Sequence, residues 1–522
     1  MTSFNHPLQC IQLVCGKNST SRNILVASAG SKLYSYSAES GQRLSVWPQD
    51  GAEASSADYG ASASNEDIEG PPEKKRKVDP SEESETKIKN GTTVAAVTAN
   101  KNAPWTSIPI LTFTADGAYL VALTGEDKTI RVFQIQEDGS FNQLSERQMP
   151  KRPCAITFTD DNSILTGDKF GDVYSMPLIP SAEAPARISK IQSQPRSTRI
   201  AATNLTVHTA RNLRSLEMQE QQKRKAAEKK QKQGDQDEEK DKELEKPVFE
   251  HDLLLGHVSL LTDVAFASLP SPDPASSKKR TYILSADRDE HIRVSRGPPQ
   301  AHVIENHCFG HTSFISKLCV PEWAPEYLIS GGGDPNLFVW KWVNGGLVQS
   351  VPLPEQPTGS EDESKEVAIR GIWASPSTTE VDSQRLVLVA LEGNPTMYPF
   401  TLSQSGSLTP QTPLTASANI LDIQFTSPSS ILVSLDTLHI PSSSTEWVST
   451  PSSPSQYLQT FQLKDGNWES VSSPLIEAVA QAGTESITFK DEKEGKRVKS
   501  QLSNGLYGLE NLRKKMWDDN AE

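Results

Sequence analysis

Two sets of residues in this chain carry the side-chain types of a nucleophilic hydrolase site. Each contains a histidine, a serine and an aspartate in the same chain order: His311, Ser330 and Asp334, and His257, Ser285 and Asp289. Such a trio can activate a serine hydroxyl if that serine is exposed beside a group that stabilises an oxyanion. A catalytic triad is singular in a chain, whereas this pattern occurs twice. We therefore interpret both sets as structural.

The sequence contains no motif typical of an active site. It lacks the G-x-S-x-G serine elbow, the G-x-x-x-x-G-K-[ST] phosphate loop, a G-x-G-x-x-G run after a strand and the H-E-x-x-H zinc motif. The glycine run GGGD at 331–334 is explained as a turn. The five cysteines form no C-x-x-C pair, and their odd number argues against a disulfide framework or a zinc site. We expect no catalytic residue, no cofactor and no metal, so the chain is not expected to be an enzyme.

The histidine sets belong to a repeated unit of short strands. In each copy a turn aspartate stands six residues before an aromatic or equivalent position: DKTIRVF from Asp127, DKFGDVY from Asp168, DEHIRVS from Asp289 and DPNLFVW from Asp334. Looser copies start at Gly30 and Glu392, and a further apolar run covers 431–436. Outside two low-complexity stretches the copies follow one another after 41, 45, 58 and 44 residues. Three of these intervals match the ~40–45 residues of a propeller blade. The sequence predicts an all-β, seven-bladed WD-repeat β-propeller.

The residue types around each turn fit the hydrogen-bonded stack of WD-type repeats. In that stack a histidine, a serine or threonine, the turn aspartate and a tryptophan bond to one another. Trp340 completes the set that contains His311, whereas Ser295 stands at the tryptophan position of the set that contains His257. Asp127 and Asp168 are expected to hold the same turns in their own blades.

The composition fits one large β body with polar insertions. Of 522 residues, 35% are hydrophobic, the mean hydropathy is −0.50 and the formal charge is −14, so generic polyanion binding is not expected. No long apolar run or signal-like N-terminus occurs, which predicts a soluble chain that is neither secreted nor membrane-spanning. We expect blades over 1–47, 104–180 and 249–469, disordered or charged insertions at 48–103 and 181–248, and a tail over 470–522 with a short helix.

Both insertions carry charge without a core-facing stripe. The first holds four consecutive cations between prolines: Lys74, Lys75, Arg76 and Lys77. An extended basic segment of this kind is what an importin groove binds, so it predicts nuclear localisation, with a solvated charge run as the alternative. The second insertion is interpreted as a solvated linker or partly formed helix, with RNA contact by residues 223–232 as the alternative.

The C-terminal tail has apolar residues at helical spacing. They are Leu506, Leu509, Leu512 and Met516, with Tyr507 and Trp517 alongside. A helix here could dock on the propeller or on a partner, and the sequence leaves both open. It also leaves open whether the strand at 11–14 or the strand at 457–463 closes the ring.

A dense cluster of charges surrounds the turn at Asp289. It consists of Asp287, Arg288, Glu290, His291, Arg293 and Arg296. Loops gather at propeller rims, and complementary charges at a rim can select a partner. Packing between blades is the alternative, since Arg131 occupies the position of Arg293 in another copy.

Four segments resemble one known family. They are YILSADRDEHIRVSRGPPQAHVIENHCFGHTSFISKL at 282–318, the following YLISGGGDPNLFVWKW, DKFGDVYSMPL at 168–178 and LLLGHVSLLTDVAF at 253–266. They resemble the WD-repeat non-catalytic subunit of the eukaryotic tRNA guanine-N7 methyltransferase, in its fungal form. The match covers roughly 105–180 and 250–345 and does not extend to the insertions. A scaffold for another nuclear RNA-processing or chromatin complex is the alternative.

The resemblance implies a heterodimer with a separate S-adenosylmethionine-dependent enzyme that methylates N7 of a guanine in the tRNA variable loop. This chain would hold and order that enzyme, and would touch tRNA weakly or indirectly. Arg293 falls on the family's basic interface position and is expected to meet an acidic side chain of the enzyme. Its neighbours at the same rim would assist: Arg288, Asp287, Glu290, His291 and Lys169.

Overall fold

The computed structural model describes most of the chain outside the insertions. The described residues are 4–14, 23–49, 105–181, 218, 221, 249–271, 279–354, 367–376, 385–450, 454–464, 466–489 and 491–514. All of them except Pro48 and Gln49 belong to one compact unit of residues 1–47 and 105–522. The candidate import residues Lys74, Lys75, Arg76 and Lys77 lie outside the described residues, as do nearly all of the second insertion and the tail residues Met516 and Trp517.

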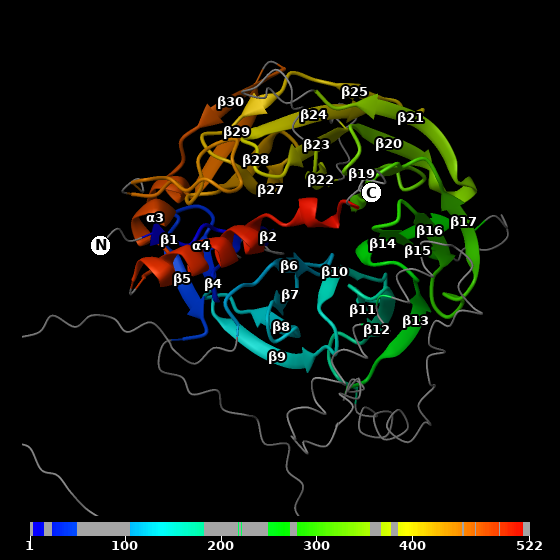
Figure 1. Ribbon diagram of the computed structural model, residues 1–522, viewed down its shortest axis with the longest axis horizontal. Helices are drawn as coiled ribbons and strands as arrows, with labels where there is room; N and C mark the ends of the chain where they lie inside the picture. The colour runs from blue at the N-terminus through cyan, green and yellow to red at the C-terminus, as the bar shows by residue number, and fades with distance from the viewer. Residues whose placement is uncertain are drawn as a thin grey trace, which may run out of the picture. The chain divides into compact units, whose positions relative to one another are not determined.

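Seven antiparallel sheets stand around a central axis in this unit (Figure 1). Blade 1 contains β2 (Cys10–Val14), β3 (Ile24–Ala29), β4 (Lys32–Ser37) and β5 (Arg43–Trp47). Blade 2 contains β6 (Ile110–Phe113), β7 (Tyr119–Thr124), β8 (Thr129–Ile135) and β9 (Phe141–Gln148). Blade 3 contains β10 (Pro153–Phe158), β11 (Ile164–Asp168), β12 (Asp172–Met176) and β13 (Asp252–Gly256). Blade 4 contains β14 (Leu261–Pro270), β15 (Lys279–Asp287), β16 (Ile292–Arg296) and β17 (Ile304–Cys308).

The remaining blades follow the same order. Blade 5 contains β18 (Ile315–Cys319), β19 (Leu328–Gly332), β20 (Asn336–Lys341) and β21 (Gly346–Pro352), with the short helix η1 (Trp342–Asn344). Blade 6 contains β22 (Ile369–Ala374), β23 (Leu386–Leu391), β24 (Thr396–Leu402) and β25 (Leu408–Pro410), and β26 (Leu414–Thr415) also pairs with β24. Blade 7 contains β27 (Ile420–Ser427), β28 (Ser430–Leu435), β29 (Leu458–Lys464) and β30 (Asn467–Val471). The predicted seven-bladed propeller is confirmed.

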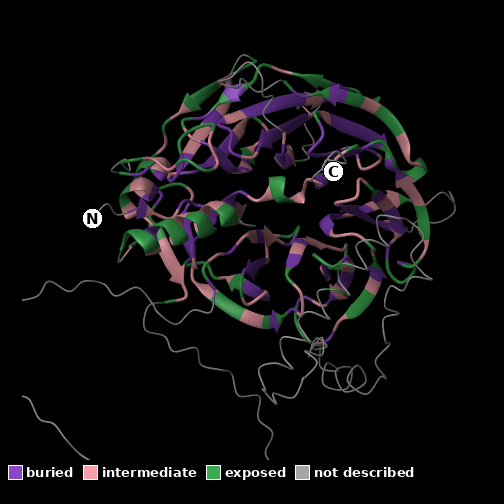
Figure 2. Cartoon of the chain, in the orientation of Figure 1, coloured by how far each residue is buried: buried purple, intermediate pink, exposed green. Residues whose placement is uncertain are grey.

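Burial follows the position of a strand in its blade. The second strands β3 (ILVASA) and β23 (LVLVAL) are buried at every residue, because neighbouring blades cover both faces. Continuous apolar runs are the sequence signature of strands covered on two sides. The fourth strand β9 (FNQLSERQ) is mostly polar and exposed, since it forms the outer edge of its blade. Figure 2 shows this gradient from buried inner strands to exposed outer ones.

The antiparallel strand order puts two kinds of connection at one end of the ring. These are the turns between the second and third strands of each blade and the loops that join successive blades. We call this end the turn face. His257, in the loop before β14, donates its backbone N–H to Gly171 in the turn between β11 and β12, at 2.7 Å. Side chains from these connections therefore lie side by side.

The ring closes without a strand shared between the two ends of the chain. β2 is the first strand of blade 1, and β27 to β30 complete blade 7 from consecutive strands. Instead, β1 (Phe4–Asn5) pairs with β31 (Ser486–Ile487). The backbone N–H of Ile11 in blade 1 also donates to Asp422 Oδ2 in blade 7 at 2.9 Å. Neither of the two candidate closing strands therefore crosses into the other blade.

Two helices after blade 7 complete this closure. The helix α3 (Pro474–Ala482) buries Leu475 and Val479 against Tyr34 and Tyr36 of blade 1, in a cluster that also includes blade 7 residues. The helix α4 (Glu492–Leu506) begins at Asp491, whose side chain accepts the backbone N–H of Glu494. Most of the described tail thus docks on the propeller itself.

The tail contains the expected helix, but this helix lies earlier in the chain than the apolar spacing from Leu506 onward indicates. The helix α4 ends at Leu506, and among the described residues up to 514 only the short η2 (Leu509–Leu512) follows. The backbone N–H groups of Gly508 and Leu509 donate to the Glu392 carboxylate in blade 6, at 2.8 and 3.1 Å, rather than to helix carbonyls. The three-residue spacing of the leucines fits the 3₁₀ turn equally well.

Candidate partner-binding surface

The histidine set of blade 5 forms the expected stack. His311 Nδ1 lies 2.6 Å from Asp334 Oδ2, and its Nε2 lies 2.8 Å from Ser330 Oγ. Trp340 Nε1 donates to the same hydroxyl at 2.8 Å. Ser330 and Trp340 are fully buried. Since no substrate can reach this serine, the set holds the joining loop to the turn and is not a nucleophile.

In blade 4, the assignment of Asp289 as the turn aspartate is wrong. His257 Nε2 lies 2.7 Å from Ser285 Oγ, but its Nδ1 faces Asp287 Oδ2 at 3.4 Å. Asp287 Oδ1 also accepts the backbone N–H groups of Asp289 and His291, at 2.9 and 3.1 Å. Asp287 is therefore a structural residue and not a rim side chain offered to a partner. In this blade Ser295 stands at the tryptophan position and accepts a hydrogen bond from Arg293 Nε at 2.9 Å. Without a tryptophan to bond to the stack, the turn aspartate need not lie six residues before that position.

Blades 2 and 3 use their turn aspartates in related ways. Asp168 is buried, and its Oδ1 accepts the backbone N–H groups of Phe170 and Asp172 at 2.8 and 3.2 Å. Asp127 accepts the N–H of Thr129 at 3.3 Å and pairs with Arg131 at 2.9 Å. Both residues shape turns.

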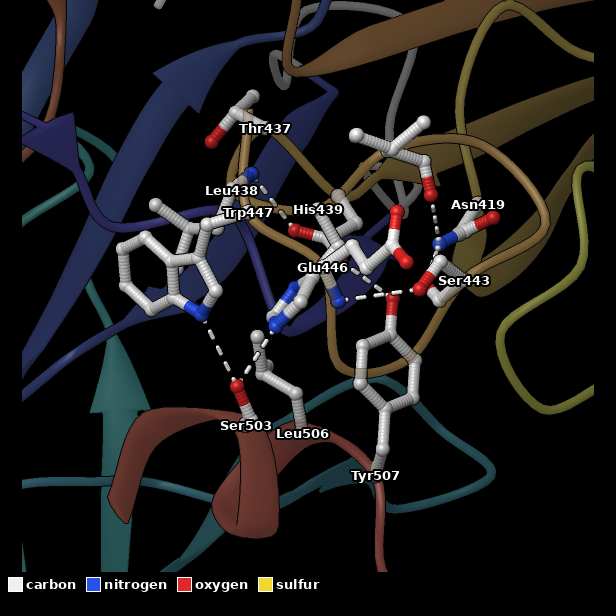
Figure 3. Close-up of polar contacts among 12 residues, drawn as sticks. Asn419, Thr437, Leu438, His439, Ser443, Glu446, Trp447, Ser503, Leu506 and Tyr507 are labelled. Carbon is white, nitrogen blue, oxygen red and sulfur yellow. Dashed lines mark hydrogen bonds and ion pairs between the residues drawn. The ribbon is translucent and has the colours of Figure 1, made fainter. Parts of the chain in front are cut away.

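A third serine–histidine–aspartate set, missed by the sequence reasoning, joins blade 7 to the tail (Figure 3). His439 Nδ1 lies 2.7 Å from Asp436 Oδ2, and its Nε2 lies 2.7 Å from Ser503 Oγ in α4. Trp447 Nε1 donates to the same hydroxyl at 3.0 Å, and the Tyr507 hydroxyl donates to Asp436. The set was hidden because its serine comes from a helix 64 residues along the chain. It holds α4 in place.

The basic residue expected at the interface lies at the turn face. Arg293, on β16, donates from its guanidinium Nη1 to the Gly256 carbonyl at 3.1 Å, beside the loop that joins blades 3 and 4. It stands opposite His307 in the sheet register. Partial burial lowers the pKa of the Arg293 guanidinium, and burial together with the Arg293 charge lowers the pKa of His307. Arg293 is thus held in one orientation while it remains partly accessible.

The most exposed apolar side chains come from the two blades that Arg293 and its partner Gly256 belong to, and the sequence reasoning did not single them out. Among the large apolar residues that the structure describes, four are the most exposed: Val258 at 109%, Phe309 at 64%, Leu253 at 58% and Phe170 at 55%. All four belong to blades 3 and 4 or to the loops that follow them. Exposed apolar groups gathered in one region mark an interaction surface.

Three of these side chains, Phe170, Val258 and Phe309, come from connections at the turn face, where local contacts position them. Phe170 and Lys169 are exposed in the turn that ends at Gly171, where φ is +96° and a Cβ would lie 2.5 Å from the His257 carbonyl oxygen. Only glycine lets this turn pack so closely on the loop that carries Val258. Phe309 stacks on His307 with ring centroids 5.3 Å apart, and meets His291 edge-on at 5.8 Å. We call the surface formed by Lys169, Phe170, Val258, His291, Arg293, His307 and Phe309 the blade 3–4 rim.

Three other charged residues of the cluster are engaged by the chain's own tail. Arg288 Nε donates to the Leu512 carbonyl at 2.7 Å. Lys514 Nζ pairs with Asp289 Oδ1 at 3.1 Å and with Glu290 Oε1 at 3.2 Å. The cluster seen in the sequence therefore divides into a structural aspartate, a tail-bound group and the residues of the blade 3–4 rim, while Arg296 pairs with Glu305 at the other end of β16.

The inner strands carry a buried carboxyl group that opposes folding when it ionises. Burial raises the pKa of Asp422 from 3.8 to about 6, although Ile11 N–H and Ile423 N–H donate to it. Between these values the folded chain holds a proton that the unfolded chain has lost, so this group makes stability fall as pH rises from 4 to 6.

We expect Asp422→Asn to remove that slope. The difference in the free energy of unfolding between pH 4 and pH 6.5 should change by on the order of 2 kcal/mol relative to the parent protein. Urea unfolding at a series of pH values measures it. Glu322→Gln, which removes an exposed carboxyl group, is the control. Equal slopes in the parent protein and in Asp422→Asn would contradict the expectation.

Within the described residues, no three His, Cys, Asp or Glu side chains are grouped to bind a metal ion. The described helices are also too short or too polar to cross a membrane.

Comparison with known proteins identifies the family. The family model described as "tRNA methyltransferase TRM82 WD40 domain" matches residues 25–461. The chain belongs to the TRM82 family. Three TRM82 relatives named tRNA (guanine-N(7)-)-methyltransferase non-catalytic subunit come from Aspergillus oryzae, Aspergillus fumigatus and Coccidioides immitis. Their identities are 46%, 47% and 40%, over 99%, 99% and 94% of this chain and 99%, 99% and 95% of each relative. The predicted family is confirmed, and these names agree with the expectation of a non-catalytic protein.

Proposed function

We propose that this chain is the non-catalytic adaptor subunit of a tRNA guanine-N7 methyltransferase. The observation that carries the proposal is the similarity over almost the whole length to fungal relatives with that name. The buried serines of the WD stacks support it, because none is available as a nucleophile.

The blade 3–4 rim is the proposed contact with the catalytic subunit. Exposed phenylalanines beside an arginine are the side chains that dominate protein interfaces. The guanidinium of Arg293 suits a carboxylate of the enzyme, and Lys169 adds positive charge at the same rim. Contacts made only with the active arrangement of the enzyme would shift its population towards that arrangement. In this proposal tRNA is contacted weakly or indirectly, consistent with the formal charge of −14.

Reconstitution tests the adaptor role. Purified full-length chain is combined with the catalytic tRNA guanine-N7 methyltransferase subunit and tRNA, and 7-methylguanosine is measured. We expect no product from this chain alone, and much more product from the mixture than from the enzyme alone. Failure of the two proteins to co-purify, or full activity of the enzyme without this chain, would overturn the proposal.

Nuclear import is the second part of the proposal. Four consecutive cations between prolines, Lys74, Lys75, Arg76 and Lys77, would bind an importin. Deleting 71–80 should move a fluorescently tagged chain from nucleus to cytoplasm. Deleting an equal length at 54–63, which contains no Lys or Arg, is the control. Unchanged nuclear accumulation after the first deletion would remove the import role.

A further inference from the structure

The last residues that the structure describes form a segment that crosses the turn face. Residues 507–514, which we call the strap, follow α4 and contact blades 7, 6, 5 and 4 in turn. Tyr507 bonds to Asp436 in blade 7, and the N–H groups of Gly508 and Leu509 bond to Glu392 in blade 6. Figure 1 shows this segment, in red, continuing from the inner end of α4 across the middle of the ring.

Arg513 anchors the far end of the strap. Its guanidinium donates to the carbonyls of Gly333 and Val367, at 3.1 and 2.8 Å, and to Ser313 Oγ at 3.3 Å. It also lies over the ring of Phe314, 5.4 Å from the centroid. This set of contacts fixes where the next residue, Lys514, can reach.

Lys514 reaches the turn that adjoins the blade 3–4 rim. Its ammonium group pairs with Asp289 and Glu290, which directly precede His291 of the blade 3–4 rim. The side chain of Lys514 is 36% exposed and those of its partners 46% and 35%. Exposed ion pairs of this kind add little to stability. Their larger effect is on the local charge, because two carboxylates beside the rim would otherwise repel an acidic partner.

We infer that the strap completes the partner-binding surface, with Lys514 as a specificity-determining residue for an acidic partner surface. When the strap docks, Lys514 neutralises the negative charges of Asp289 and Glu290. The partner then meets the positive charges of Arg293 and Lys169. Binding of the catalytic subunit and docking of the strap therefore favour each other. This inference rests on the proposed function, since the partner is the same enzyme.

Hydrogen exchange tests this coupling directly, because coupling between two binding events is reciprocal. The amides of Gly508 and Leu509, bonded to Glu392, report strap docking. In the full-length chain saturated with the catalytic subunit, exchange at 508–514 should be several-fold slower than in the chain alone. Equal or faster exchange in the complex would overturn the inference, and faster exchange would mean that the enzyme displaces the strap.

A charge-reversal cycle tests the role of Lys514. We expect Lys514→Glu to weaken binding of the catalytic subunit roughly tenfold at low salt, mainly through slower association, and less at high salt. In the double variant Asp289→Asn with Glu290→Gln, the same Lys514→Glu change should cost less than about twofold, since no carboxylates remain to be compensated. Lys496→Glu is the matched control, because Lys496 pairs with Glu492 on the same face of α4 at 2.9 Å.

The outcomes separate this inference from the proposed function. If the parent chain binds the enzyme and Arg293→Glu does not, the adaptor role holds, and the Lys514 results alone judge the strap. An unchanged association rate in Lys514→Glu, or an equal loss in Lys496→Glu, would overturn the strap inference and leave the adaptor role intact. Absence of binding by the parent chain would end both.

Discussion

Arg293→Glu should abolish binding of the catalytic methyltransferase subunit, with a loss of roughly 100-fold or more in affinity. The guanidinium is held by Ser295 and Gly256 beside the loop that carries the exposed Val258. Reversing its charge places a carboxylate against the acidic group that it is proposed to meet. Surface plasmon resonance with full-length proteins gives the affinity, and loss of stimulated 7-methylguanosine formation should accompany it.

The control for this variant lies on the same strand. Arg296 is three residues further along β16 and pairs with Glu305, so Arg296→Glu makes the same charge change at the opposite end of the strand. We expect it to bind the enzyme within about threefold of the parent chain. Arg293→Gln should give an intermediate affinity. An Arg293→Glu protein that unfolds at the parental temperature and still binds tightly would exclude Arg293 from the interface.

Ending the chain at Ser472 should prevent closure of the ring. This truncation removes five buried apolar side chains: Leu475, Val479, Ile487, Leu506 and Tyr507. At roughly 1.5–3 kcal/mol each, their gross contribution is comparable with the whole net stability of an ordinary domain, about 5–15 kcal/mol. The melting temperature should fall by more than ~10 °C, or cooperative unfolding should disappear. Calorimetry and size-exclusion chromatography measure both.

A chain that ends at Tyr507 separates closure from the strap. It keeps the five buried side chains and loses residues 508–522, which include the rest of the strap. We expect cooperative unfolding close to that of the full-length chain, with weaker binding of the enzyme. If the chain that ends at Ser472 melted within about 3 °C of the parent protein, the pairing of β1 with β31 and the packing of α3 would not be what closes the ring.

The blades could be predicted because their signals are local. A turn aspartate, an apolar strand and a tryptophan such as Trp340 lie within a few residues of one another. Blade 4 shows the limit of this approach, since Ser295 replaces the tryptophan and the choice between Asp287 and Asp289 then depends on His257, about 30 residues away. The start of α4 could have been found, because Asp491 followed by Glu494 is a helix-capping pattern.

The partner-binding surface was predictable only in part. Its charged residues stand out in the sequence, but exposure does not, so Phe170, Val258 and Phe309 look like ordinary strand or loop residues. The strap could not be predicted from the sequence for another reason. Arg288, Glu392 and Asp436 meet it across 71 to 224 residues of chain, and no local pattern announces such contacts.

Because every blade is made of four consecutive strands, synthesis on the ribosome delivers the blades one at a time, each complete before the next emerges. Blade 1 is made first, yet its neighbour on one side and the segments that fasten it are made last. One flank of blade 1 must therefore stay uncovered throughout translation. A chaperone that shields apolar strands would act on this flank until blade 7 and α3 have been made.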